Sequence, residues 1–153
     1  VSVGLSETRA EFGFGAVRLT SKLIDGTFPD YTRVIPTGND RIMQVDAASF
    51  AAAVDRVSTI SSEKSRSVKM GLKPGVLTLS ASNTDASSAI EEIEVTYDGV
   101  EMDIGFNARY LLDIAAQVNN DIVEFALADQ GSPSLVRAPG DDASLFVLMP
   151  MRV

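Results

Sequence analysis

Between residue 41 and the C-terminus, apolar and polar residues follow two periods that predict short strands and two helices. Alternating apolar positions, as at Ile93, Val95 and Tyr97, are typical of a strand with one buried face. Asp46 can cap a helix that runs to about residue 60, and Asn107 can cap a second helix that runs to about residue 118, because each side-chain oxygen can accept a backbone N–H of the first turn. The expected strands cover residues 42–45, 68–72, 76–82, 90–97, 102–106, 122–128, 135–138 and 144–149.

The two expected helices share one pattern of buried positions. Each has apolar residues at i, i+3, i+4 and i+7, which is the spacing of one buried helix face. The matching positions are Phe50, Ala53, Val54 and Val57 in the first helix and Leu111, Ile114, Ala115 and Val118 in the second. Because each helix follows one strand and precedes several, we expect an α+β fold in which a strand-helix-strands unit occurs twice, with two helices packed on antiparallel sheets. Convergent helix patterning is the alternative explanation.

The first 36 residues follow a different pattern. Residues 1–22 are expected to form a hairpin, with one strand over 1–5, a polar turn, and a second strand over 11–22. An isolated hairpin is marginally stable in water, so it needs a sheet that this chain does not supply. Residues 23–36 contain Gly26, Pro29 and Pro36 and are expected to form a connector. Because the first residue is Val and strand-like sequence follows at once, we expect the chain to be part of a longer protein.

Composition narrows the possible chemistry. The 153 residues contain no Cys and no His, which excludes disulfides, Cys/His zinc sites and catalytic triads that use either residue. A site made only of carboxylates remains possible, although no tight Asp-x-Asp cluster or calcium-loop spacing occurs. Neither a Gly-x-Ser-x-Gly motif nor a phosphate-binding loop is present. No apolar stretch approaches the ~20 residues of a membrane helix, and no signal peptide is visible.

The net charge of −8 argues against a protein that simply coats DNA, which is normally basic. The charges are unevenly spread, and no Lys or Arg lies between Lys73 and Arg109. That stretch holds seven acids, namely Asp85, Glu91, Glu92, Glu94, Asp98, Glu101 and Asp103. Basic residues gather instead at Arg56, Lys64, Arg66, Lys69 and Lys73.

The last nine residues form an apolar strand that reaches almost to the end of the chain and finishes in Met-Pro-Met-Arg before Val153. Chain ends are usually polar and frayed, so an apolar end must either pack in a core or serve as a surface for a partner. Methionine side chains are flexible and suit surfaces that accept varied apolar ligands. The alternative is a core strand whose tip carries methionine.

Two segments of the chain carry long and specific motifs. The first reads Leu-Ile-Asp-Gly-Thr-Phe-Pro-Asp-Tyr-Thr-Arg-Val-Ile-Pro over residues 23–36, and the second is Met-Pro-Met-Arg at 149–152. Together they resemble the bacterial DNA sliding clamp, the beta subunit of DNA polymerase III. The resemblance covers the whole chain. It implies that residues 1–22 are the last strands of the middle clamp domain, 23–36 the interdomain connector and 37–153 the third clamp domain.

The resemblance implies a processivity factor without catalysis, cofactor or metal, which encircles duplex DNA in the bacterial cytoplasm at the nucleoid. Polymerases, the clamp loader and mismatch-repair proteins would insert short motifs rich in Gln, Leu and Phe into one shared groove. The residues that match the lining of that groove are Pro29, Arg33, Val34, Asn107, Tyr110, Val147, Leu148, Met149, Pro150, Met151 and Arg152. The alternative for Tyr110 is a partly buried aromatic near a cap, and for Arg33 a salt bridge in the connector.

The family also lines the hole of its ring with helices whose basic residues contact phosphate without reading bases. The residues that match this role are Arg56, Lys64 and Arg66, whose alternative is a solvated helix end. The full clamp is a homodimer that closes head to tail, and the matching edge would include Ile60, Asp85, Glu91 and Glu92 facing a basic partner. Because no first domain is visible, we expect this chain alone not to close a ring.

Two further functions compete with the clamp interpretation. One is a stand-alone peptide-binding scaffold domain without a DNA role, which would share the apolar C-terminal groove but lack the long connector motif. The other is a carboxylate-dependent hydrolase or metal enzyme, which would need acids that converge in one pocket. Three departures from the family pattern bear on partner preference: Ser65 stands where some members carry an aromatic residue, the stretch 131–133 differs, and Val153 replaces a common Leu.

Overall fold

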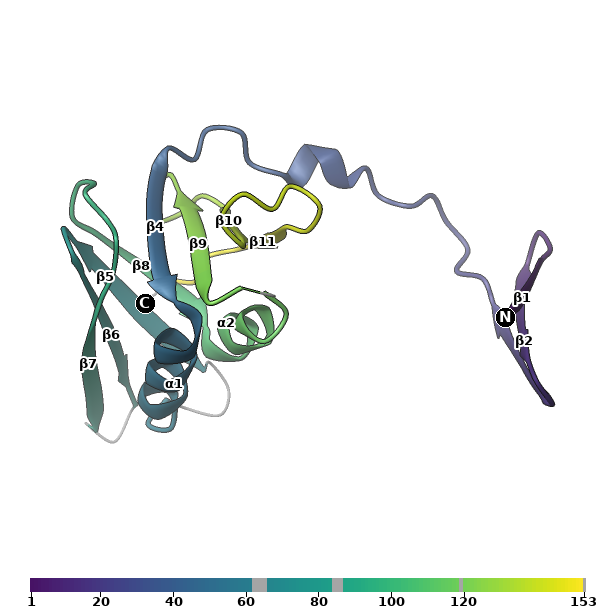
Figure 1. Cartoon of the computed structure of the whole chain (residues 1–153), viewed down its shortest axis with the longest axis horizontal. Helices are drawn as coiled ribbons and strands as arrows, with labels where there is room; N and C mark the ends of the chain where they lie inside the picture. The colour runs from purple at the N-terminus through teal and green to yellow at the C-terminus, as the bar shows by residue number, and fades with distance from the viewer. Residues whose placement is uncertain (62–65, 84–86, 119, 153) are drawn as a thin grey trace. The chain divides into compact units, whose positions relative to one another are not determined.

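The computed structural model describes residues 1–61, 66–83, 87–118 and 120–152, and Figure 1 labels most of its helices and strands. The chain forms two compact units, Val1–Tyr31 and Thr32–Val153. The boundary between them falls inside the expected connector, where a short 3-10 helix, η1, covers Tyr31–Val34. The assignment of the two units to a middle and a third clamp domain stays a prediction.

The first unit is a three-stranded antiparallel sheet. Its strands are β1 (Ser2–Leu5), β2 (Arg9–Phe14) and β3 (Val17–Lys22), in the order β1-β2-β3. The expected single strand over 11–22 is therefore wrong, because the chain reverses at Gly15 and Ala16. Phe14 pairs with Val17 across this two-residue loop, and Gly15 has φ +56°, a conformation that suits glycine at the first loop position.

This first sheet has almost no core of its own. Ala10 is the one buried residue in the unit Val1–Tyr31, all of which is described. Large apolar side chains lie exposed instead, namely Val3, Leu5, Phe14, Val17 and Leu19. Exposed apolar side chains of this kind are typical of surfaces that contact other protein. The need of these strands for a larger sheet stays a prediction.

In the described part of the second unit, the strands form two four-stranded antiparallel sheets. The first half of the unit runs through β4 (Arg41–Asp46), α1 (Ala47–Ser58), β5 (Ser67–Lys73), β6 (Val76–Ser82) and β7 (Ser88–Glu94). The second half runs through β8 (Met102–Asn107), α2 (Ala108–Ala115), β9 (Ile122–Leu127), β10 (Ser134–Arg137) and β11 (Phe146–Leu148). The sheets have the orders β11-β10-β9-β4 and β7-β6-β5-β8, so the first strand of each half joins the sheet of the other half. This exchange confirms the expected doubled α+β unit.

Both helices begin where the sequence predicts. The Asp46 carboxylate accepts the Ser49 N–H at 2.7 Å, and the Asn107 side-chain oxygen accepts the Arg109 N–H at 2.9 Å. The second helix ends earlier than the expected residue 118. Beyond Ala115 the chain forms a tight turn in which the N–H groups of Gln117 and Val118 both donate to the Ile114 carbonyl, at 2.9 and 3.1 Å.

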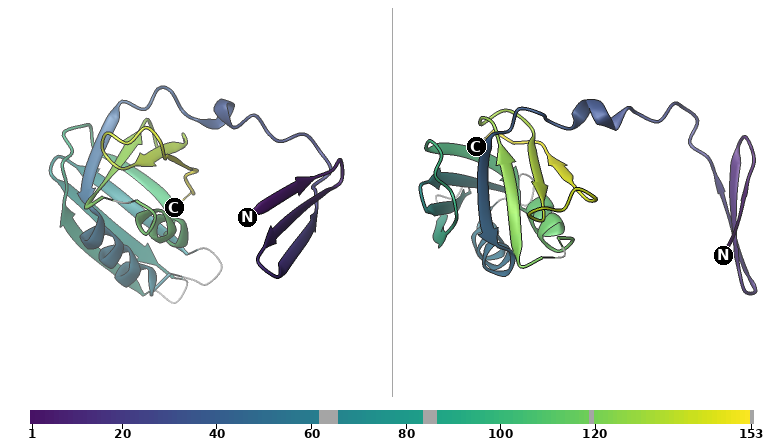
Figure 2. Two further views of the ribbon diagram at one scale, coloured as in Figure 1. Left: turned by 45° about the vertical axis from the view of Figure 1, so that its right-hand side comes forward. Right: turned by 45° about the horizontal axis from the view of Figure 1, so that its top comes forward.

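The helices lie side by side and pack on both sheets (Figure 2). Their buried face matches the expected spacing, with Phe50, Val54 and Val57 of α1 and Leu111 of α2 in one hydrophobic core. The ring of Phe50 meets that of Phe125 on β9 edge-on, with centroids 5.3 Å apart. This contact joins the helix of the first half to a strand of the second.

The two halves end in the same way. After β7 the chain leaves β6, and Thr96 exchanges two backbone hydrogen bonds of 2.9 Å with Gln44 on β4. After β11 it leaves β10, and the Met151 N–H donates to the Gly105 carbonyl on β8 at 2.8 Å. Each half thus returns to its own first strand, and this pairing holds the chain just beyond its last strand.

Candidate functional site: an apolar hollow between α2 and β11

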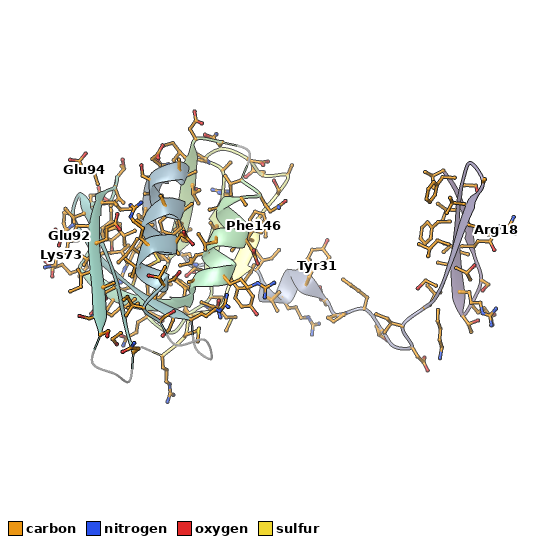
Figure 3. The ribbon with its side chains drawn as sticks, turned by 90° about the horizontal axis from the view of Figure 1, so that it is seen from below. Arg18, Tyr31, Lys73, Glu92, Glu94 and Phe146 are labelled. Atoms are coloured by element: carbon orange, nitrogen blue, oxygen red, sulfur yellow. The ribbon has the colours of Figure 1, made fainter. Side chains whose placement is uncertain are left out.

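The described surface of the second unit carries a hollow of about 400 Å³ between α2 and β11. From α2 it is lined by Tyr110, Asp113 and Ile114, and from the C-terminal strand by Phe146, Val147, Leu148 and Met149. The helical residues stand at i, i+3 and i+4 and therefore share one face of α2. Phe146 lies beside this helix (Figure 3).

The position of β11 sets the shape of the hollow. Its three residues pair with β10, with Leu148 opposite Ser134 and Phe146 opposite Val136. Leu148 is buried in the core, whereas Phe146 and Val147 are half-buried and Met149 is exposed. Because the Met151 N–H donates to the Gly105 carbonyl just beyond β11, the C-terminal end of the strand is also held in place.

The lining suits an apolar side chain that arrives on an extended segment. Apart from the Tyr110 hydroxyl and the Asp113 carboxylate, the side chains in the lining are hydrocarbon or thioether. In addition, β11 is the outermost strand of its sheet, so its free edge can pair with an extended peptide. Both features are typical of a site that recognises a short peptide.

The structure brings together part of the expected groove. Tyr110, Val147, Leu148 and Met149 line the hollow, while Pro150, Met151 and Arg152 continue beyond it. Asn107 uses its side-chain oxygen to cap α2. Arg33 and Val34 lie in η1 and are absent from the described lining, and Pro29 belongs to the first unit. The groove role of these residues stays a prediction.

Sequence reasoning missed three lining residues, Asp113, Ile114 and Phe146. Ile114 stands one helical turn after Tyr110, and Phe146 stands two residues before Leu148, so each shares a face with a residue that was expected in the groove. These two spacings were the available signals. For Asp113 no signal distinguishes it from an ordinary solvated carboxylate.

A residue expected to face DNA and one expected at a subunit interface turn out to be partners. The Arg56 Nε on α1 donates to Glu91 on β7 at 3.0 Å, and a second guanidinium nitrogen donates to the other carboxylate oxygen. The hydrogen bond from Arg56 is the main reason that the pKa of Glu91 lies below its usual value, and the same bond raises the pKa of Arg56.

Strand alternation explains why Glu91 turns toward the helix. Glu91 lies on the face of β7 that packs against α1, whereas Glu92 and Glu94 lie on the opposite, outer face (Figure 3). Glu92 accepts a hydrogen bond from Thr78 Oγ1 at 3.3 Å, and Ile60 is half-buried in the turn after α1. The other two residues of these predictions, Lys64 and Asp85, lie outside the described residues.

Arg66 lines a second cavity of about 350 Å³, which lies between the end of α1 and the beginning of α2. It has φ +42°, and its carbonyl accepts the Ala108 N–H at 2.8 Å. Arg109 lines the same cavity, together with Asp55 and Asp113. The two cations therefore share this surface with two carboxylates.

Residues 1–61, 66–83, 87–118 and 120–152 contain no group of three or more acidic side chains arranged to hold a metal ion. Within the same ranges, neither helix has the length and hydrophobicity needed to cross a bilayer.

Comparisons with known proteins give one consistent family. The model of the DNA polymerase III beta subunit, C-terminal domain, matches residues 32–152. The beta sliding clamp of Caulobacter vibrioides is 54% identical over 153 residues, which are 100% of this chain and 41% of the relative. That of Pseudomonas aeruginosa is 38% identical over 153 residues, again 100% of this chain and 42% of the relative. The chain thus spans about two fifths of the length of these relatives.

Solved structures agree with this result. A Caulobacter crescentus beta sliding clamp, with polyethylene glycol bound at its proposed beta-motif tethering region, has a TM-score of 0.93 and 54% identity, and the match covers 99% of this chain and 41% of that one. A sliding clamp from Bartonella birtlesii bound to griselimycin has a TM-score of 0.92 and 50% identity, with 99% and 41% of the two chains covered.

Proposed function

Because the chain belongs to the DNA polymerase III beta subunit family and carries its C-terminal domain, we propose that it forms the last domain of a ring-shaped processivity clamp that tethers partner proteins to duplex DNA. The hollow between α2 and β11 is the observation that carries this proposal, because it is an apolar binding site beside a free strand edge. The related clamp with a tethering region supports the same role. Such a protein works by binding alone, in the bacterial cytoplasm, and it catalyses no reaction.

The partners are replicative and other DNA polymerases, the clamp loader and mismatch-repair proteins, each of which presents a short motif. An apolar residue of the motif enters the hollow between Ile114 and Val147, and the neighbouring backbone lies along β11. Burial of one large apolar side chain provides about 1.5–3 kcal/mol, so a motif with two such anchors reaches useful affinity even in a shallow site. Because one site serves every partner, the partners compete for it.

Duplex DNA passes through the ring without being read. Arg56 lies on α1, Arg109 lies on α2, and Arg66 precedes β5 beside them. In this proposal these three side chains contact phosphate groups. Phosphate contacts carry no base identity, so they allow movement along any sequence. The Arg56 guanidinium already donates a hydrogen bond to Glu91, and the carboxylates of Asp55 and Asp113 lie near Arg66. This arrangement favours weak contacts, as a sliding protein needs.

Ring closure requires a second subunit. The strand β7 is the free edge of its sheet in this chain, and its outer face presents Glu92 and Glu94. A head-to-tail contact of this edge with a basic surface of the next subunit would close a homodimer. We expect the 153-residue chain by itself to remain monomeric, and light scattering that shows a stable dimer would contradict this expectation.

The test is fluorescence anisotropy with a labelled Gln-Leu-x-Leu-Phe peptide. We expect saturable binding by this chain, at least tenfold weaker binding by Met149→Glu, and unchanged binding by Val100→Glu. Met149 is exposed at the rim of the hollow, whereas Val100 is exposed in the loop after β7, so both variants should fold. Equal binding by the two variants would mean that the peptide binds outside the hollow, and no binding by any protein would favour the scaffold interpretation over the clamp.

A further inference from the structure

We propose that Asp113 makes the hollow between α2 and β11 select peptide segments that carry a Lys or Arg beside their apolar anchor. This inference rests on the proposed function and deepens it by naming the chemistry of the preferred partner segment. Asp113 is the one ionised side chain in the described lining, where its neighbours are Ile114 and the apolar residues of β11. A ligand that fills the hollow therefore comes within reach of a fixed negative charge.

The carboxylate is available to a ligand. The ion pair that the structure describes for Asp113 is with Arg109, one helical turn earlier, at 3.8 Å from Nε. This separation exceeds hydrogen-bond length, and the side chains are 67% and 71% exposed. Exposed ion pairs of this kind contribute little to stability. A cation on the ligand can therefore replace Arg109 beside Asp113 at a small cost in free energy.

The geometry also places the charge beside the anchor site. Asp113 stands three residues after Tyr110 and directly before Ile114, so its carboxylate borders the apolar floor. It also lines the neighbouring cavity with Arg66 and Arg109, and the described lining of that cavity includes no residue of β11. A basic residue next to the anchor meets Asp113 on the open side, whereas an acidic residue there is repelled. The net charge of −8 adds long-range attraction for a basic segment.

The test uses two labelled peptides that differ only at the residue beside the apolar anchor, which is Lys in one and Gln in the other. For the unaltered chain we expect the Lys peptide to bind about two- to fivefold more tightly, as for an exposed ion pair. This ratio should fall toward one in Asp113→Asn and in 0.5 M salt, because screening weakens exposed pairs. Arg109→Gln frees the carboxylate, so the ratio should increase.

Asp98→Asn is the matched control, because it removes the same charge from a loop outside the described lining of the hollow. It should keep the ratio of the unaltered chain. If both peptides bind the unaltered chain equally, or if Asp113→Asn keeps the preference for Lys, the inference is wrong while the proposed function stands. If neither peptide binds, the proposed function and this inference fail together.

Discussion

The two halves of the second unit have the same order of elements but differ in the space between the helix and the last strand. Both begin with a strand and a capped helix, and both end by returning to that first strand, at Thr96 and at Met151. In the first half, a helix of 12 residues faces a last strand of 7 residues. In the second half, a helix of 8 residues faces a last strand of 3 residues. The space between helix and last strand is bridged by an ion pair in the first half and open in the second.

Equivalent positions show how the difference arises. Glu91 lies five residues before Thr96, and Phe146 lies five residues before Met151, so the two occupy matching places on the last strands. In the first half this place holds a carboxylate that reaches the helix through Arg56. In the second half it holds an apolar ring beside a shorter helix, and the remaining space is the hollow. A duplicated unit can thus keep its core while one copy gains a binding site.

The largest loss of stability is expected from a substitution in the core where the two halves pack against each other. Phe50→Ala removes a fully buried ring that packs edge-on against Phe125, and should lower the free energy of unfolding by about 3–5 kcal/mol. Because this contact joins both halves, the two sheets should lose stability together, with one urea transition shifted to lower concentration. Phe14→Ala, at an exposed position of the first unit, is the control and should change little. Separate transitions for the two sheets would show that the halves are independent.

Filling the hollow should make the second half resemble the first. Val147→Trp places an indole ring in the space beside Ile114, and should weaken binding of the Gln-Leu-x-Leu-Phe peptide at least tenfold with little change in stability. Val100→Trp adds the same ring at an exposed position outside the described lining and should leave affinity unchanged. Anisotropy titrations of both variants measure the difference. Equal affinities would mean that the peptide binds elsewhere.

The sequence predicts what depends on local spacing. Both caps, the buried face of each helix and the doubled order of elements follow from positions three or four residues apart, or from strand alternation. The missed turn at Gly15 also has a local signal in the sequence. The alternating apolar residues stand at even-numbered positions before the turn, Phe12 and Phe14, and at odd-numbered positions after it, Val17 and Leu19. A two-residue loop produces this change because Phe14 and Val17 then pair directly.

The site depends on contacts that local spacing does not contain. Arg56 and Glu91 are 35 residues apart in sequence, and only the packing of β7 against α1 brings them together. The hollow exists because α2 ends early and β11 is short, which is a property of the space between two elements. Sequence therefore predicted the apolar end of the chain as a surface for a partner, while the volume and its acidic residue required coordinates.

Substitutions of the two helix N-cap residues, Asn107 and Asp46, should have smaller effects and also compare the two halves. Asn107→Ala should cost about 1 kcal/mol of stability, and it should also weaken peptide binding, because α2 is short and forms one wall of the hollow. A variant at the cap of the other helix, Asp46→Ala, should leave peptide binding unchanged. Asn107→Asp separates two explanations, since it keeps the cap and removes the amide donor. Weak binding by Asn107→Asp would show that the amide contacts the peptide directly.

The smallest effect is expected from the ion pair that closes the first half. Arg56 holds the pKa of Glu91 below its usual value, so the charged carboxylate is favoured in the folded state. The stability that it contributes is present above the unfolded pKa, near 4.5, and is lost as the pH falls through the folded value. The urea midpoint of the unaltered chain should therefore decrease more between about pH 5 and 3 than that of Glu91→Gln.

Glu94→Gln is the control for this last measurement, because it removes an exposed carboxylate from the outer face of the same strand. Its pH profile should follow that of the unaltered chain. Part of the acid sensitivity should persist in Glu91→Gln, since hydrogen bonds to Ser49 and Gly131 also lower the pKa of Asp46 and Asp129. If Glu91→Gln and Glu94→Gln reduce the pH dependence of the urea midpoint equally, the ion pair with Arg56 contributes no more to the stability of the first half than an exposed carboxylate. The contrast with the open half would then rest on the lengths of the helices and strands alone.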